Sequence, residues 1–246
     1  MGTGVPLKGG ADGNYGKNTK GAIDTFAANH KLTQGVINKQ FADTLLQAPQ
    51  VPAPVAKAIA KLTDQDFSDC ATSLDCQIAA VRAVVAVESA GGGFLPDGRP
   101  KILFEAKYFH KLTGGKFDKT NPNISSPVWN KNLYKGGARE WDRLNEALAL
   151  DHDAALQSAS WGLFQIMGAN YKLCGFDNVN DFVAAMEKSE GDQLKAFIGF
   201  VKSNKLDGFL RTRNWASFAN GYNGPGYKKN QYDVKLANAY NKYAKA

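Results

Sequence analysis

The stretch "AVRAVVAVESAGGGF", residues 80–94, runs from an apolar segment into a glutamate and three glycines. Val81, Val84 and Glu88 recur at spacings of three and four, which predicts one helix that carries all of them on its apolar face. A carboxyl group there loses hydration and lies near the negative end of the helix dipole, and both effects raise its pKa. The pattern predicts that Glu88 keeps its proton near neutral pH and can give it to a leaving group.

The three glycines, Gly91–Gly93, leave the backbone bare of side chains directly after this glutamate. A bulky ligand can therefore lie against the chain at this point. The alternative interpretation is a surface glutamate at a frayed helix end, followed by a glycine C-cap. Residues elsewhere in the chain are needed to decide between the two.

Composition limits the class of protein. The chain has 246 residues, of which 43% are hydrophobic and 22% charged, as in an ordinary globular protein of one or two domains. We expect no secretory signal in the opening "MGTGVPLKGG" and no membrane span. The three cysteines, Cys70, Cys76 and Cys174, form no metal-ligand pattern, so neither a metal nor a cofactor is predicted. We expect reduced, buried thiols, with a Cys70–Cys76 pair as the alternative.

The net charge of +7 is concentrated near the C-terminus. Residues 201–246 hold seven Lys, two Arg and two Asp, so the remainder of the chain is neutral overall. A basic end indicates a polyanionic partner such as a nucleic acid, an anionic membrane or a bacterial wall. The alternative is a solvated lysine face without a partner.

The segment "QAPQVPAPVA" separates two parts of the chain, because its prolines block a helix and stiffen a linker. We predict a small domain at 1–48, a linker at 49–56 and a larger domain at 57–246. In the first part, Asn18 or Thr19 is expected to cap a helix, and "KQFADTLLQ" to form another. The larger part reads as mainly helical, with a loop at 112–135. The expected helices are 55–63, 77–90, 100–111, 140–149, 179–189, 191–204, 214–220 and 230–244.

Two further motifs suit a ligand rich in hydroxyl and amide groups. "SWGLFQIMG", residues 160–168, places Gln165 in an apolar stretch, where its amide can both donate and accept hydrogen bonds. "ANGYNGPGY", residues 219–227, places Tyr222 and Asn223 before a Gly-Pro-Gly turn. Taken singly, the first can be core and the second a loop.

Taken in order, Glu-Ser, Gly-Leu-Phe-Gln-Ile-Met and Tyr-Asn-Gly-Pro-Gly resemble the three-part signature of lysozyme-like transglycosylases and goose-type lysozymes. The longer segments "VESAGGGFLPDGRPKILFEAKYFHKLTGG", "SASWGLFQIMGANYKLCGF" and "WASFANGYNGPGYKKNQYDVKLANAY" resemble the N-acetylmuramidase domain of phage endolysins. This resemblance covers residues 60–246. The segment "DGNYGKNTKGAIDTF" resembles the second half of the peptidoglycan-binding module, with too few residues before it for the usual first helix.

The resemblance implies a mainly α fold, with a lysozyme-like catalytic domain, a small helical N-terminal domain and at most a small β element. It also implies cleavage of the β-1,4 bond between N-acetylmuramic acid and N-acetylglucosamine. Glu88 would be the general acid and Ser89 would support its position. Gln165, Tyr222 and Asn223 would line the cleft, and Trp161 is the best of the tryptophans for stacking on a sugar.

The second catalytic group is less defined. Glu105, in "PKILFEAKYF", is a candidate for catalysis or for substrate positioning, and a structural role in which it bonds the loop or Arg99 is the alternative. Asp97 reads as a turn residue. Without a second carboxylate, either water attacks or the muramyl 6-hydroxyl attacks to give a 1,6-anhydro sugar. We favour the hydrolase over the lytic transglycosylase.

Other classes of function remain as alternatives. A non-catalytic wall-binding protein is one, and membrane contact by the basic C-terminal helix is another. We expect a monomer that acts on peptidoglycan, with weak anionic membrane or wall-polymer contact through its C-terminus and no nucleic-acid partner. An endolysin without a signal peptide would stay in the host cytoplasm until it is released to the periplasm or the wall.

Overall fold

The computed structural model describes residues 17–47, 60–88 and 92–245. The chain forms two compact units, residues 1–57 and 58–246, which are described separately here. The proline-rich segment expected as a linker, 49–56, lies outside the described residues.

In the described residues of the first unit, 17–47, the chain forms two helices, α1 (Lys17–Asn29) and α2 (Lys39–Gln47). Its core is small and centres on Phe26 and Phe41, whose rings meet edge to face at 5.2 Å. The Asn38 side chain caps α2 by accepting a hydrogen bond from the Phe41 amide at 2.9 Å. Because α1 already begins at Lys17, the prediction that Asn18 or Thr19 caps this helix is wrong.

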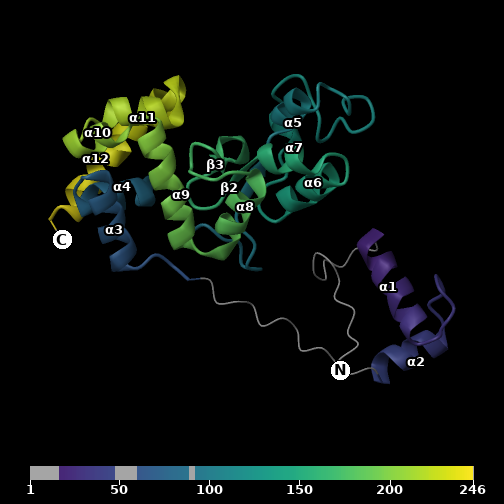
Figure 1. Ribbon diagram of the computed structural model, residues 1–246. Helices are drawn as coiled ribbons and strands as arrows, with labels where there is room; N and C mark the ends of the chain where they lie inside the picture. Colours follow the sequence, from purple (N-terminus) through teal and green to yellow (C-terminus); the bar gives the residue numbers. More distant parts are fainter. Residues whose placement is uncertain (1–16, 48–59, 89–91, 246) are drawn as a thin grey trace. The chain divides into compact units, whose positions relative to one another are not determined.

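The second unit is mainly helical and begins with α3 (Asp64–Leu74) and the apolar helix α4 (Ile78–Glu88). The last helix, α12 (Tyr232–Tyr243), packs along α4, and its Leu236 is fully buried. Figure 1 shows α3, α4 and α12 grouped with α10 (Asp207–Thr212) and α11 (Trp215–Asn223).

A small sheet lies beside this group (Figure 1) and consists of β1 (Ile102–Phe104), β2 (Ala159–Trp161) and β3 (Ile166–Met167). All neighbours are antiparallel, in the order β1-β2-β3, with Ile102 opposite Trp161 and Trp161 opposite Ile166.

Further helices pack around the sheet and bury the main core with it. They are α5 (Ala106–Leu112), α6 (Arg139–Leu148), α7 (His152–Gln157), α8 (Val179–Lys188) and α9 (Glu190–Ser203), with short 3-10 turns η1 (Lys131–Leu133), η2 (Gly168–Asn170) and η3 (Pro225–Asn230). The fold class is therefore confirmed: the unit is mainly α, with one small β element.

Two expected helices in the second unit are wrong. Of the expected helix 55–63, residues 55–59 lie outside the described residues and residues 60–63 are irregular, and α3 begins at Asp64. Its start carries a capping box, in which the Thr63 side chain and the Asp66 side chain each bond the other's backbone amide. The expected helix 100–111 is divided into strand β1 and helix α5, with Glu105 between them.

The remaining helical predictions are close to the structure. The helices expected at 77–90, 140–149, 179–189, 191–204 and 230–244 appear as α4, α6, α8, α9 and α12, within two residues at each described end. α7 and α10 were not predicted, and the helix expected at 214–220 continues to Asn223. All three cysteines are free thiols, with Cys70 and Cys174 buried.

Within the described residues, no single helix has the length and hydropathy to cross a membrane. α3 and α4 meet that test only as a pair, and the chain bends by 111° between them.

Candidate active site

Glu88 is the last residue of α4, and its half-buried side chain faces a cleft. Asn223, at the end of α11, donates a hydrogen bond from Nδ2 to Glu88 Oε1 at 3.1 Å. Burial raises the pKa of the Glu88 carboxyl, whereas the Asn223 hydrogen bond and the charge of Lys235 act in the opposite direction. The structure therefore brings Glu88 and Asn223 together and gives Glu88 the raised pKa that a general acid needs.

Tyr222 connects α11 to the sheet. Its hydroxyl donates to the carbonyl oxygen of Phe164 at 2.9 Å, and its ring lies parallel to the Phe218 ring at 5.6 Å. Burial raises the pKa of this hydroxyl well above its ordinary value, and the charge of Glu88 adds to the shift. Tyr222 thus stays a neutral donor, and it fixes the backbone next to Gln165.

Gln165 lies in the turn between β2 and β3. The turn depends on a left-handed Gly162, with φ of +68°, and Gln165 itself has φ of 48°. The Gln165 amide donates to the Gly162 carbonyl at 2.8 Å and to the Lys101 carbonyl at 3.3 Å, and its Oε1 accepts from the Ser160 hydroxyl at 2.9 Å. These bonds hold an exposed amide at the wall of the cleft.

The cleft itself has a volume of about 380 Å³. Its walls come from the end of α4, the loop before β1, strand β1, the residues before α6 and the β2–β3 turn. The lining residues are Glu88, Gly92, Leu95, Lys101, Ile102, Leu103, Gly136, Gly137, Glu140, Gly162, Leu163 and Gln165.

Two buried polar side chains of α9 support the cleft, and the sequence reading missed both. Gln193 accepts a hydrogen bond from the Leu163 amide at 2.6 Å and donates to the Met186 carbonyl at 2.7 Å. Glu190 accepts from the Gly93 amide at 2.9 Å. A side chain at Gly93 would collide with Gln193, at 2.1 Å from its Oε1. Gly93 is therefore needed for close packing against α9.

A second missed carboxylate, Glu140, is fully buried on α6 at the floor of the cleft. Its oxygens accept from the amides of Lys135, Gly136 and Phe104 at 2.6, 2.9 and 3.2 Å. Arg143 Nη1 lies 2.8 Å from its Oε2. Burial alone would raise the pKa of Glu140, but these amides and the guanidinium outweigh it and lower the pKa. A carboxylate so fully bonded orders the walls of the cleft and is not suited to exchange protons.

Glu105 follows β1 directly and lies in a second, much smaller pocket with Tyr134 and Trp129. The Tyr134 hydroxyl donates to Glu105 Oε2 at 2.7 Å. Burial, together with the Glu105 carboxylate, raises the pKa of Tyr134 to about 12, so that it remains a donor. Arg99 pairs with Asp97 instead, at 2.6 Å in the turn 95–99.

Trp161 is a core residue. Its side chain is only 1% exposed, its Nε1 donates to the Leu156 carbonyl at 3.0 Å, and its ring meets Trp141 edge to face. The prediction that Trp161 offers a stacking face to a sugar is therefore wrong. Trp129 is the tryptophan with an open ring, at 62% exposure. Ser89 lies outside the described residues.

The arrangement suits acid-catalysed bond cleavage. Glu88, whose carboxyl pKa is raised, and the exposed amide of Gln165 line the same open cleft and can bind and protonate a neutral, oxygen-rich ligand. Within the described ranges, no group of three or more His, Cys, Asp and Glu side chains is placed to bind a metal ion.

Comparison with known proteins supports this interpretation. The sequence profile of the N-acetylmuramidase family matches residues 77–244, which include Glu88, Gln165 and Asn223. No match is found among curated proteins. Among solved structures, the crystal structure of the Burkholderia AP3 phage endolysin is similar, with 39% identity and a TM-score of 0.72, over 99% of this chain and 92% of that one. The chain belongs to the N-acetylmuramidase family.

Proposed function

We propose that the protein is an endolysin that hydrolyses the β-1,4 bond between N-acetylmuramic acid and N-acetylglucosamine in bacterial peptidoglycan. The observation that carries this proposal is Glu88, a partly buried carboxyl group with a raised pKa, at the wall of the cleft in a member of the N-acetylmuramidase family. The similarity to a phage endolysin along 99% of the chain supports the role in lysis of a host cell.

In the proposed reaction, the Glu88 carboxyl gives its proton to the glycosidic oxygen, and the bond from that oxygen to the anomeric carbon breaks. The sugar develops oxocarbenium character. A water oxygen then bonds to the anomeric carbon and loses a proton, which leaves a reducing end. The Gln165 Oε1, which accepts one bond from Ser160, offers its second lone pair as an acceptor at the wall of the cleft, and Asn223 orients the Glu88 carboxyl.

We assign the second carboxylate to Glu105, which would take up the proton of the attacking water. Leu103, two residues before it, lines the cleft, and Tyr134, its hydrogen-bond partner, comes two residues before the cleft-lining Gly136. Glu105 itself lies in the separate small pocket, and it is connected to cleft-lining residues through strand β1 on one side and through Tyr134 on the other. Glu88 is half-buried beside Asn223, whereas Glu105 accepts a hydrogen bond from the Tyr134 hydroxyl.

We further assign residues 1–48 to a peptidoglycan-binding role and residues 49–56 to a linker, with 57–246 as the catalytic domain. The support is the motif at residues 12–26 and the separate small core around Phe26 and Phe41. On this proposal the first unit keeps the enzyme on the wall between cleavage events.

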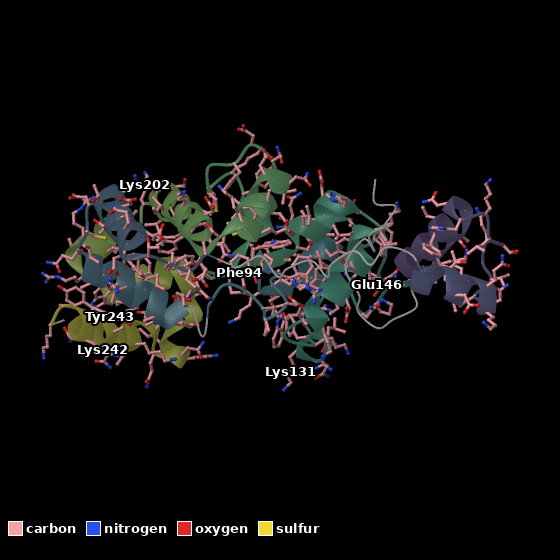
Figure 2. The ribbon with its side chains drawn as sticks, turned by 90° about the horizontal axis from the view of Figure 1, so that it is seen from below. Phe94, Lys131, Glu146, Lys202, Lys242 and Tyr243 are labelled. Carbon is pink, nitrogen blue, oxygen red and sulfur yellow. The ribbon has the colours of Figure 1, made fainter. Side chains whose placement is uncertain are left out.

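The test compares Glu88→Gln, Glu105→Gln and the control Glu146→Gln on purified peptidoglycan. Glu146, labelled in Figure 2, binds the amides of Asn121 and Asn123 and lies outside the proposed chemistry. We expect the control to keep near-normal turnover. We expect Glu88→Gln to lose about 10³-fold or more and Glu105→Gln about 10²-fold or more.

Folding of each variant is checked by circular dichroism before activity is compared. Normal turnover by Glu88→Gln would remove Glu88 as the acid and contradict the mechanism. Normal turnover by Glu105→Gln would return Glu105 to a structural role and leave water activation to another group.

A further inference from the structure

An exposed aromatic surface lies on the loop between α5 and α6. The Trp129 ring is 62% exposed and the neighbouring Val128 is 65% exposed. Large apolar side chains seldom stay this open without a partner when they are grouped on one loop. Lys131, in the short helix that follows, extends from the outer edge of the unit (Figure 2).

The exposed indole is held in place by the surrounding loop. Trp129 Nε1 donates to the Tyr134 hydroxyl at 2.8 Å, and that hydroxyl donates to Glu105 at 2.7 Å. The backbone nearby is fixed by the Ser126 hydroxyl, which donates to the Val128 carbonyl at 2.8 Å. A ring held this way presents its face to a ligand at a low cost in conformational entropy.

A basic pocket of about 640 Å³ lies next to this surface. Lys107 and Lys111 stand one turn apart on α5, and both line the pocket with Tyr108 and His110. Within the described part of the chain, neither lysine forms an ion pair with a carboxylate. The nearby Asp118 is already engaged by His110 at 2.8 Å and by the Ser125 hydroxyl at 2.5 Å.

The two features are joined to each other and to the cleft through shared segments. Lys107 lines both the small Glu105–Trp129 pocket and the basic pocket. Residues 101–103 line the Glu88 cleft, 105–107 line the small pocket, and 107–111 contribute to the basic pocket. The cleft and the two pockets are thus lined in part by one short segment of chain, residues 101–111.

We propose that Trp129, Lys107 and Lys111 form a recognition site for the peptide-bearing part of the glycan. The Trp129 face would take an apolar sugar face, and the two lysines would take carboxylates of the stem peptide attached to muramic acid. This inference rests on the proposed function, because it assumes that the cleft binds peptidoglycan. It adds a reason for preferring stem-bearing strands over bare glycan.

The expected changes in KM are modest but measurable. Exposed ion pairs are individually weak, so the loss of both lysines should raise KM for stem-bearing strands about fivefold. The loss of a stacking face should cost about tenfold in KM, whether or not the stem is present. The loss of the two lysines should alter kcat by no more than about twofold, since neither lysine bonds Glu88 or Glu105. Trp129→Ala also removes a donor to Tyr134, the partner of Glu105, so its stacking role is judged from KM alone.

The experiment uses the full chain with two soluble substrates: glycan strands that carry their stem peptides, and the same strands after an amidase has removed the stems. The variants are Lys107→Ala/Lys111→Ala and Trp129→Ala. Trp129→Phe keeps a ring face but loses the indole donor. The matched control is Lys229→Ala/Lys242→Ala, which removes the same charge, with Lys242 at the far end of the unit from Lys131 in Figure 2.

We expect Lys107→Ala/Lys111→Ala to raise KM on stem-bearing strands only. We expect Trp129→Ala to raise KM on both substrates, and the KM of Trp129→Phe to stay closer to that of the wild type. An equal rise on both substrates for the lysine variant would overturn stem recognition, as would an unchanged KM. An unchanged KM for Trp129→Ala would overturn the stacking role. Failure of the wild-type protein to cleave either substrate would instead contradict the proposed function.

Discussion

Opposing effects act on the pKa of the Glu88 carboxyl group. Burial favours the protonated form, while the Asn223 amide and the charge of Lys235 favour the ionised form. The net effect is a pKa above that of an ordinary glutamate, in the direction that a general acid needs.

Asn223→Ala removes the donor that favours ionised Glu88, so the pKa of Glu88 should rise further. Because the acid must be protonated to act, turnover falls as pH rises through that pKa. The alkaline limb of the pH–rate profile should therefore move to higher pH in Asn223→Ala. Lys235→Met should move it in the same direction by less, because its effect is the smaller one. A shift to lower pH in Asn223→Ala would contradict this account of Glu88.

Glu88→Gln should also change how stability depends on pH. The pKa of Glu88 is higher in the folded protein than in the unfolded chain, so the folded state binds this proton more tightly. That contribution is fully present below the unfolded pKa and is lost as pH rises through the folded pKa. Glutamine cannot ionise and avoids the loss. In urea unfolding, the variant should gain stability over the wild type as pH rises from the unfolded pKa of glutamate, about 4.3, to the folded pKa of Glu88. A gain in the reverse order would be inconsistent with a raised pKa.

At the scale of elements, the β2–β3 turn and the start of α9 form one packed joint. Gly162 has φ of +68°, and a Cβ there would lie 2.5 Å from Gln193 Cδ. Gly162→Ala should therefore destabilise the protein by about 1–3 kcal/mol and lower activity by displacing Gln165. Gly208→Ala, in α10 with open space around it, should change stability by less than about 1 kcal/mol. Thermal unfolding of the two variants measures this difference. Equal losses of stability in both variants would contradict close packing of the β2–β3 turn against α9.

The elements also show what the sequence could predict. Apolar periodicity located α4, α8, α9 and α12 well, because each buries one face against the core. The strands were missed because β1 and β2 have only three residues each, too few for an alternating pattern to be distinguished from a helical one. The start of α3 is marked in the sequence by its capping box, Thr63 and Asp66.

The sequence likewise predicted some residues of the site and not others. Glu88, Gln165, Tyr222 and Asn223 stand in compact motifs. Glu88 and Gln165 line the cleft, Asn223 bonds Glu88, and Tyr222 bonds the carbonyl of Phe164, the residue before Gln165. Glu140, Glu190 and Gln193 could not be predicted, since their roles depend on contacts with distant loops. Trp161 was misjudged because its proximity to Gly162 in sequence says nothing about which side of the strand its ring occupies.

At the scale of the whole molecule, the chain combines a large unit with its own core and a small unit with a minimal one. We expect a fragment of residues 58–246 to fold and to cleave soluble glycan strands at a rate close to that of the full chain. On insoluble sacculi, the fragment should bind more weakly than the full chain if residues 1–48 contact the wall. Sedimentation with sacculi measures this difference, and equal binding would assign wall affinity to the large unit.

The basic C-terminal region belongs to the large unit and packs through α12 against α4. Leu236 of α12 is fully buried, and α12 packs along α4, the helix that ends at Glu88.

The most direct test of the central claim is mass spectrometry of the products released from purified peptidoglycan, with and without borohydride reduction. We expect the wild-type protein to release products that carry N-acetylmuramic acid at reducible ends. We expect Glu88→Gln to release no such products. Ends in the 1,6-anhydro form would contradict hydrolysis and indicate a lytic transglycosylase. An absence of sugar products from folded protein would contradict the enzyme altogether and leave a wall-binding protein.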